Sequence, residues 1–202
     1  MAPHYKNRDE RAAAVAAGLP ADREAVASLA LATADRYDAA ILNCDAAAFE
    51  DAADTFEAII YHLNGGSLFG SMAEGGGAYQ LRDILSPADG TAAGWGRPSR
   101  FAVELDDVRA VIRYTPGFLS FAPHFELYAV DVDRPFISET GYQSHFYTAD
   151  FPAMPVDGFA RSLLRGLDAR RTLQLAAIPR VIQRCPAWMA PNTLRGQIGF
   201  AF

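Results

Sequence analysis

The chain has 202 residues, of which 50% are hydrophobic and 21% charged, so it is long enough to bury a core and too apolar to stay disordered. Its 18 basic and 24 acidic residues give a net charge of −6, and no apolar run approaches the roughly 20 residues that span a bilayer. Because the N-terminus also lacks a signal peptide, we expect a cytoplasmic protein of one domain (residues 1–202) without membrane contact.

The chain begins with polar and then alanine-rich residues. Residues 1–20 are typical of a flexible arm or a short helix. A first longer helix is predicted over residues 22–37, because apolar side chains recur at helical spacing behind Asp22, a residue type favoured as an N-cap.

The strongest helical pattern covers residues 45–63. Asp45 is a good N-cap, one face is apolar, and Gly65 and Gly66 stand where a helix is expected to end. The other face carries Glu50, Asp51, Asp54 and Glu57. These acids are interpreted first as a solvated face, with an acidic docking surface as the alternative.

Neither the glycines nor the cysteines indicate a cofactor. The glycine-rich residues 64–81 follow a helix, whereas a phosphate-binding loop follows a strand and carries a spacing that is missing here. A tightly turning loop is therefore favoured over a nucleotide site. Cys44 and Cys185 form no metal-binding or disulfide pattern and are predicted to be buried as small apolar residues. No cofactor and no metal are expected.

The centre of the chain carries the strand signal. Residues 79–85 are predicted as a short helix or strand, and a loop follows. Apolar residues alternate with polar ones over 101–105 and again over 108–114, which predicts an antiparallel hairpin. A third apolar run, 118–130, is interrupted by Pro123, which cannot donate to a strand ladder and so indicates a break or an edge.

Polar side chains gather directly after the third strand. They are Asp131, Asp133, Arg134, Ser138, Glu139, Thr140, Tyr142, Gln143, Ser144 and His145. Asp131, Asp133 and His145 could hold a hard metal ion. Ser138 and His145 are the residue types of a nucleophile and its base. Because no second histidine and no GxSxG motif accompany them, the favoured interpretation is local ion pairing and turn formation.

One segment of this cluster has relatives. The string DVDRPFISETGYQSHF, residues 131–146, resembles a segment of accessory proteins that bacterial plasmids and phages carry, often alongside antirestriction genes. The resemblance covers this segment alone and brings no assigned site residue with it. It implies a small protein that acts on host defence or plasmid maintenance by binding rather than by turnover.

The C-terminal residues 158–202 are basic. Seven arginines stand there against one acid, a net charge of +6, which leaves −12 for the rest of the chain. A helix is predicted behind Asp157, and residues 192–202 are apolar enough for a final strand. This basic segment, with Arg165, Arg170 and Arg171, could pair with the acidic body, with an acidic protein or with nucleic acid.

These patterns predict an α+β fold, with an antiparallel sheet of about three to five strands packed against two or three helices, because strands and helices come in runs. The favoured function is a non-enzymatic accessory protein of a bacterial mobile element that binds and modulates a host protein or protein complex, for example as an anti-defence inhibitor. The first alternative is nucleic-acid binding through the basic C-terminal segment, and the second is a small enzyme. The residues assigned to the favoured function are Glu139, Thr140, Tyr142, His145, Glu50, Asp54 and Glu57. Nucleic-acid binding would use Arg165, Arg170 and Arg171. The enzyme would use Asp131, Asp133, Ser138 and His145.

Overall fold

A computed structural model describes residues 3–105, 108–120, 122–130, 141–148 and 151–168, and the structural statements below concern these residues. The helices are α1 (Pro3–Ala16), α2 (Arg23–Leu42), α3 (Ala46–Leu63), α4 (Gly77–Leu85), the short 3₁₀ helix η1 (Gly117–Leu119) and α5 (Val156–Asp168). The strands are β1 (Ser99–Leu105), β2 (Val108–Thr115), β3 (His124–Ala129) and β4 (Tyr142–Phe146). The predicted α+β class is confirmed.

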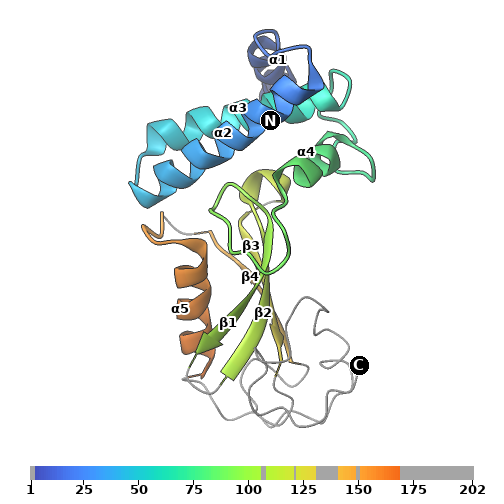
Figure 1. The fold of residues 1–202 in the computed structure, drawn as a ribbon. Helices are drawn as coiled ribbons and strands as arrows, with labels where there is room; N and C mark the ends of the chain where they lie inside the picture. Colours follow the sequence, from blue (N-terminus) through green and yellow to red (C-terminus); the bar gives the residue numbers. More distant parts are fainter. Residues whose placement is uncertain (1–2, 106–107, 121, 131–140, 149–150, 169–202) are drawn as a thin grey trace.

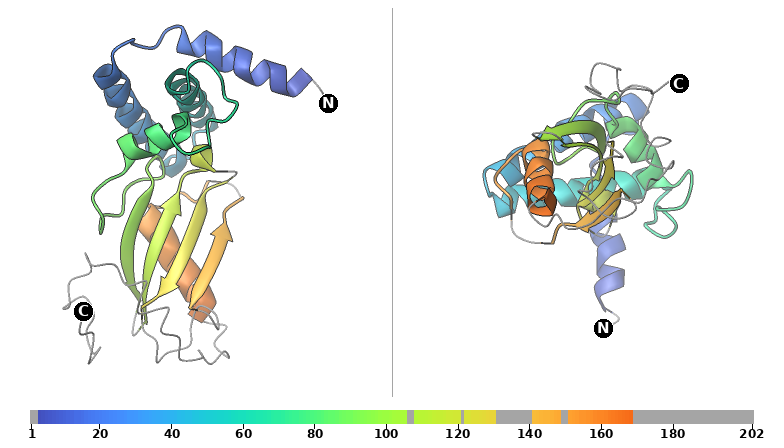
Figure 2. Two further views of the ribbon diagram at one scale, coloured as in Figure 1. Left: turned by 90° about the vertical axis from the view of Figure 1, so that its right-hand side faces the viewer. Right: turned by 90° about the horizontal axis from the view of Figure 1, so that it is seen from below.

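The helices and the sheet form two packed parts (Figure 1). Helices α2 and α3 run antiparallel across one end of the sheet, with α1 packed on α3 and α4 between the helices and the strands. The four strands are antiparallel in the order β1-β2-β3-β4, and α5 lies along one face of the sheet (Figure 2). None of the described helices is both long and apolar enough to cross a membrane.

The helix boundaries in the first half are set largely by the residues that the sequence indicates. Asp22 Oδ2 accepts a hydrogen bond from the Ala25 N–H (2.9 Å), and Asp45 Oδ1 accepts one from the Ala48 N–H (3.0 Å). Both side chains satisfy an N–H group that a helix start leaves unpaired. The prediction that Cys44 is buried is wrong: it lies in the turn between α2 and α3 with φ 55°, and its side chain is exposed.

The hairpin and the third apolar run predict three strands, and the sheet contains a fourth. β1 and β2 form the expected hairpin, and Pro123 directly precedes β3, so the third apolar run is broken there. β4 comes from the polar cluster, whose residues show no apolar alternation. At the C-terminal end, Asp157 falls in the first turn of α5 and not at its cap. The predicted final strand, residues 192–202, and Cys185 lie outside the described residues.

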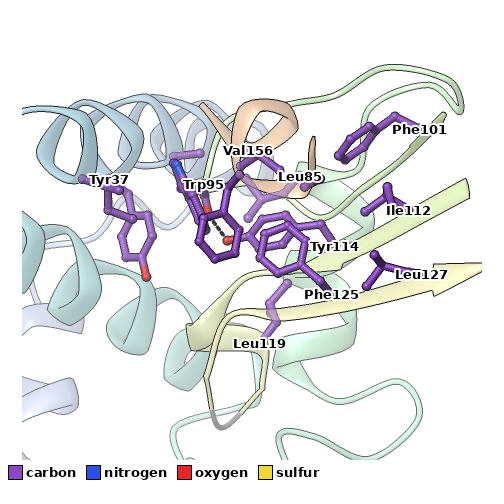
Figure 3. Close-up of a cluster of buried hydrophobic side chains, with 14 of the residues drawn as sticks. Tyr37, Leu85, Trp95, Phe101, Ile112, Tyr114, Leu119, Phe125, Leu127 and Val156 are labelled. Carbon is purple, nitrogen blue, oxygen red and sulfur yellow. Dashed lines mark hydrogen bonds between the residues drawn. The ribbon is translucent and has the colours of Figure 1, made fainter. Parts of the chain in front are cut away.

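One buried cluster joins the helices to the sheet, and Trp95 lies at its centre (Figure 3). This residue, in the connection between α4 and β1, is 0% exposed. Its backbone N–H donates to Asp38 Oδ1 (2.8 Å), its indole N–H donates to the Met154 carbonyl (2.8 Å), and its carbonyl accepts from the Tyr114 hydroxyl (2.8 Å). The connection is therefore held by α2, by β2 and by the residues before α5.

Candidate functional site

Several residues predicted for function lie outside the described part of the chain. These are Asp131, Asp133, Ser138, Glu139, Thr140, Arg170 and Arg171. Arg165 is described, and it is exposed near the end of α5.

Tyr142 and His145, both assigned to the favoured function, lie on opposite faces of the sheet. Strand β4 pairs with β3 so that Tyr142 opposes Tyr128 and His145 opposes Phe125. Phe125 is buried beneath α5, and the His145 ring lies 6.3 Å from that of Phe159. Since successive side chains on a strand point to opposite faces, Tyr142 lies on the face of the sheet away from α5, which we call the outer face.

The acidic face of α3 is largely used within the chain. Glu57 forms an ion pair with Arg8, Asp54 Oδ1 lies 2.7 Å from Arg11 Nη2, and Asp51 pairs with an arginine of α2 (2.9 Å). Glu50 is exposed. These pairs hold α1 and α2 against α3, so the acids do more than solvate the helix.

A groove of about 210 Å³ lies where α4 meets the ends of β1 and β2. Its lining includes Arg82 from α4, Arg100 from β1 and Arg113 from β2, against the acid Asp89. We call this the arginine groove. Its three guanidinium groups come from three different elements, so only the folded chain brings them together.

Two of these arginines oppose each other directly in the sheet. Arg100 and Arg113 are cross-strand partners, and like charges at such positions destabilise a strand pair. Each arginine also forms an ion pair: Arg100 lies 3.9 Å from Asp89, and Arg113 lies 3.4 Å from Glu126, its cross-strand neighbour on β3. A bound anion would relieve the repulsion between the two arginines. Without a bound anion, placing them opposite each other brings no gain in stability.

Arg82 and Ser99 also line the groove. Arg82 forms no ion pair within the described residues, and its guanidinium carbon lies 5.0 Å from the centre of the Tyr79 ring. Ser99 is 6% exposed, and its Oγ has no hydrogen-bond partner among the described residues. A buried polar atom without a partner is unusual and is often explained by a missing water or ion. Arginines from three elements that line one groove are suited to binding a phosphate group.

The outer face also carries a polar network that the sequence does not reveal. His124 Nε2 lies 2.7 Å from Ser144 Oγ, and the Tyr128 hydroxyl donates to Glu126 Oε1 (2.9 Å). Burial lowers the pKa of His124 below its usual 6.5, an effect that Glu126 opposes and Arg113 reinforces.

Catalysis by this serine and histidine is not supported by the geometry. The His124 ring stacks on Phe146 at 4.1 Å, and within the described residues no carboxylate accepts a hydrogen bond from its second ring nitrogen. An orienting group of that kind is part of a nucleophile–base arrangement. No group of three or more histidine, cysteine, aspartate or glutamate residues in the described part could hold a metal ion.

The arginine groove could have been predicted in part. The hairpin centred on residues 106 and 107 already pairs Arg100 with Arg113 by counting back from its turn. Nothing in the sequence places Arg82 beside them, because that contact depends on how the helices pack across the sheet end.

Comparison with known proteins gives two family matches. Residues 11–83 match the model of the KlcB N-terminal DNA-binding domain, and residues 98–172 match that of the KlcB third domain. A KlcB protein of Escherichia coli is 43% identical over 162 residues, which cover 79% of this chain and 40% of that protein. A second Escherichia coli KlcB is 35% identical over 204 residues, covering 95% of this chain and 42% of the relative. No solved structure matches.

Over these segments the chain is similar to KlcB proteins, in agreement with the plasmid-borne class expected from residues 131–146, but the similarities do not bear on the antirestriction association. The chain spans about two fifths of the length of the curated relatives that it matches. Only residues 84–97, which include Trp95, separate the two family matches, and so short a connection cannot hold a further domain. The arginine groove draws Arg82 from the first match and its other two arginines from the second.

Proposed function

We propose that the chain is a DNA-binding accessory protein of the KlcB type, and that the arginine groove holds a phosphate of the DNA backbone. The observation that carries the site is the cross-strand pair Arg100 and Arg113, to which α4 adds Arg82. The name of the family model that matches residues 11–83 supports DNA as the ligand.

General electrostatic attraction is a poor explanation for DNA binding by the matched helices. Residues 11–83 hold four arginines against eleven acidic residues, a net charge of −7. Two of the four, Arg11 and Arg36, are paired with acids of α3. Because phosphate contacts supply much of the affinity of most DNA-binding proteins, a localised arginine site gains importance here.

The basic C-terminal segment is a second source of phosphate contacts. Its arginines, of which Arg161 and Arg165 lie among the described residues, would add affinity without fixing where the helices sit on the duplex. The family matches favour this nucleic-acid function over the host-protein inhibitor that the sequence alone ranks first.

The test is equilibrium binding of the full chain to a fluorescent DNA duplex of about 30 base pairs, measured by anisotropy at low salt. Arg82→Ala, Arg100→Ala and Arg113→Ala are each expected to weaken binding by about tenfold, or ~1.4 kcal/mol, as for the removal of a hydrogen bond to a charged group. Arg36→Ala is the matched control, since Arg36 lies on α2 and is paired with Asp51.

The variants separate the two sources of phosphate contact. If Arg165→Ala weakens binding and the three groove variants bind like the wild type, the arginine groove is not the DNA site. If the wild type binds neither duplex nor single strands, the proposed function itself is wrong. Thermal melts of each variant show whether weaker binding reflects a loss of folding.

A further inference from the structure

A second, larger hollow lies on another side of the contact between helices and sheet. Its volume is about 720 Å³, and residues of α2, α3, η1 and the stretch after β4 line it. Ring side chains dominate its walls: Tyr37, Phe49, Trp95, Phe118, Tyr147 and Phe151. None of these belongs to the arginine groove, so the two hollows are separate features.

The walls of this cavity are held by contacts among the rings themselves. The Tyr37 ring lies 4.8 Å from that of Phe49 and 5.4 Å from that of Phe118, and the Phe49 ring lies 5.1 Å from that of Phe151. Trp95 is fixed by hydrogen bonds on both its backbone and its indole. Because each ring is supported by another, the cavity is formed before any ligand arrives, as most ligand pockets are.

One carboxylate breaks the apolar character of the cavity. Glu57 lines it with a side chain that is 16% exposed. Arg8 binds Glu57 Oε1, whereas Oε2 is buried, accepts no hydrogen bond from a described residue and lies 3.8 Å from Arg11 Nη2. A buried carboxylate oxygen without a donor is costly, so the cavity wall carries a strained polar group beside its rings.

We propose that this cavity binds a small ring-bearing molecule that carries a hydrogen-bond donor, with its rings among the aromatic side chains and its donor beside the Glu57 side chain. The volume lies within the range of pockets that enclose drug-sized ligands, and such pockets combine apolar walls with a few polar groups that fix orientation. The site takes no part in the proposed contact with DNA and does not depend on it.

The probe is 1-aminoanthracene, an aromatic amine whose fluorescence rises in apolar surroundings, titrated into the full chain without DNA. Saturable binding at one site is expected. Ala53→Trp fills the cavity from α3 and should weaken probe binding at least tenfold, whereas Ala47→Trp, at an exposed position of the same helix, should leave it unchanged. Failure of the wild type to bind, or undiminished binding by folded Ala53→Trp, would overturn the proposal.

The role of Glu57 is tested by competition with 1-naphthylamine and with naphthalene, which differ by the donor alone. The wild type should prefer the amine by about tenfold, as for a hydrogen bond to a charged group. Glu57→Met keeps a side chain of similar length without the acceptor and should abolish this preference. An equal preference in both proteins would show that Glu57 does not select the donor.

A measurement on the unmodified cavity covers the case in which Ala53→Trp does not fold. The chain contains two tryptophans, so 5-fluorotryptophan labelling gives two ¹⁹F signals, and Trp188→Phe identifies that of Trp95. Addition of 1-aminoanthracene should shift the Trp95 signal with the concentration dependence of the fluorescence titration. A shift of the other signal with none at Trp95 would place the probe elsewhere and contradict the proposal.

Discussion

At the scale of single residues, Gly96 controls how closely the α4–β1 connection approaches α2. A Cβ atom at this position would lie 2.4 Å from the Ala34 carbonyl oxygen and 2.7 Å from Ala34 Cα. Backbone atoms of a helix cannot move aside easily, so a methyl group there must push the connection away from α2 and disturb the hydrogen bonds of Trp95.

Gly96→Ala should therefore lower the free energy of unfolding by about 1–3 kcal/mol, as overpacking does. Gly166→Ala is the control, because a Cβ atom in that part of α5 meets nothing within 4 Å. There the higher helix propensity of alanine should stabilise the protein by up to ~1 kcal/mol. Urea denaturation of both variants checks the pair, and equal effects would contradict the close approach of Gly96 to α2.

The residue scale is also where the sequence is most informative about helix starts and least informative about long-range contacts. Asp22 and Asp45 act as caps because capping depends on neighbours three residues away. Trp95 carries no sequence signal, since it stands alone in a glycine-rich loop and its partners lie on other elements. The same holds for Glu57, whose partners Arg8 and Arg11 are far from it in the chain.

At the scale of elements, β4 shows why a polar strand is hard to predict. Its outer face carries Tyr142 and Ser144, and its inner face carries Gln143 and His145, so polar residues occur on both sides. Apolar and polar residues therefore do not alternate along β4, and the sequence alone indicates only a cluster of candidate site residues. The hairpin of β1 and β2 can be predicted with its register, because apolar residues fill one face of both strands.

Strands β3 and β4 should make stability depend on pH. Burial lowers the pKa of His124 and of His145 below the usual 6.5. The folded chain therefore binds fewer protons than the unfolded chain just below this pH, so stability is fully present above about 6.5 and decreases as the pH falls.

Chemical denaturation between about pH 7.5 and pH 5 measures this dependence. His124→Gln and His145→Gln should each flatten it, and His62→Gln, at an exposed position of α3, is the matched control. A pH profile that the two strand variants leave unchanged would contradict the role of burial at β3 and β4.

At the scale of the whole molecule, one core runs from the helices into the sheet. The buried cluster includes Phe56 of α3, Trp95, Phe125 of β3 and Leu164 of α5. This continuity spans both family matches, and we propose that residues 3–168 fold as one unit. The α+β class could be predicted from the order of the elements, but the junction between helices and sheet, where both candidate sites lie, could not.

Composition likewise predicts the net charge of each part of the chain but not where charged side chains gather in the fold. The division into an acidic body and a basic C-terminal segment follows from composition, and it makes Arg165, Arg170 and Arg171 one set of candidate phosphate contacts. The arginine groove lies inside the acidic part, and it forms only when α4 meets the hairpin. The negative net charge of this part of the chain therefore gives no indication of the positively charged arginine groove within it.

The salt dependence of DNA binding tests the central claim most directly. Affinity for a duplex is measured by anisotropy from about 50 to 200 mM salt, for the wild type and for a variant with Arg82, Arg100 and Arg113 all changed to alanine. If the arginine groove holds DNA phosphates, wild-type affinity falls with salt, and the logarithmic slope of the variant is smaller by about one for each phosphate that its alanines no longer neutralise. Equal slopes for the two proteins, or binding that ignores salt, would contradict the account.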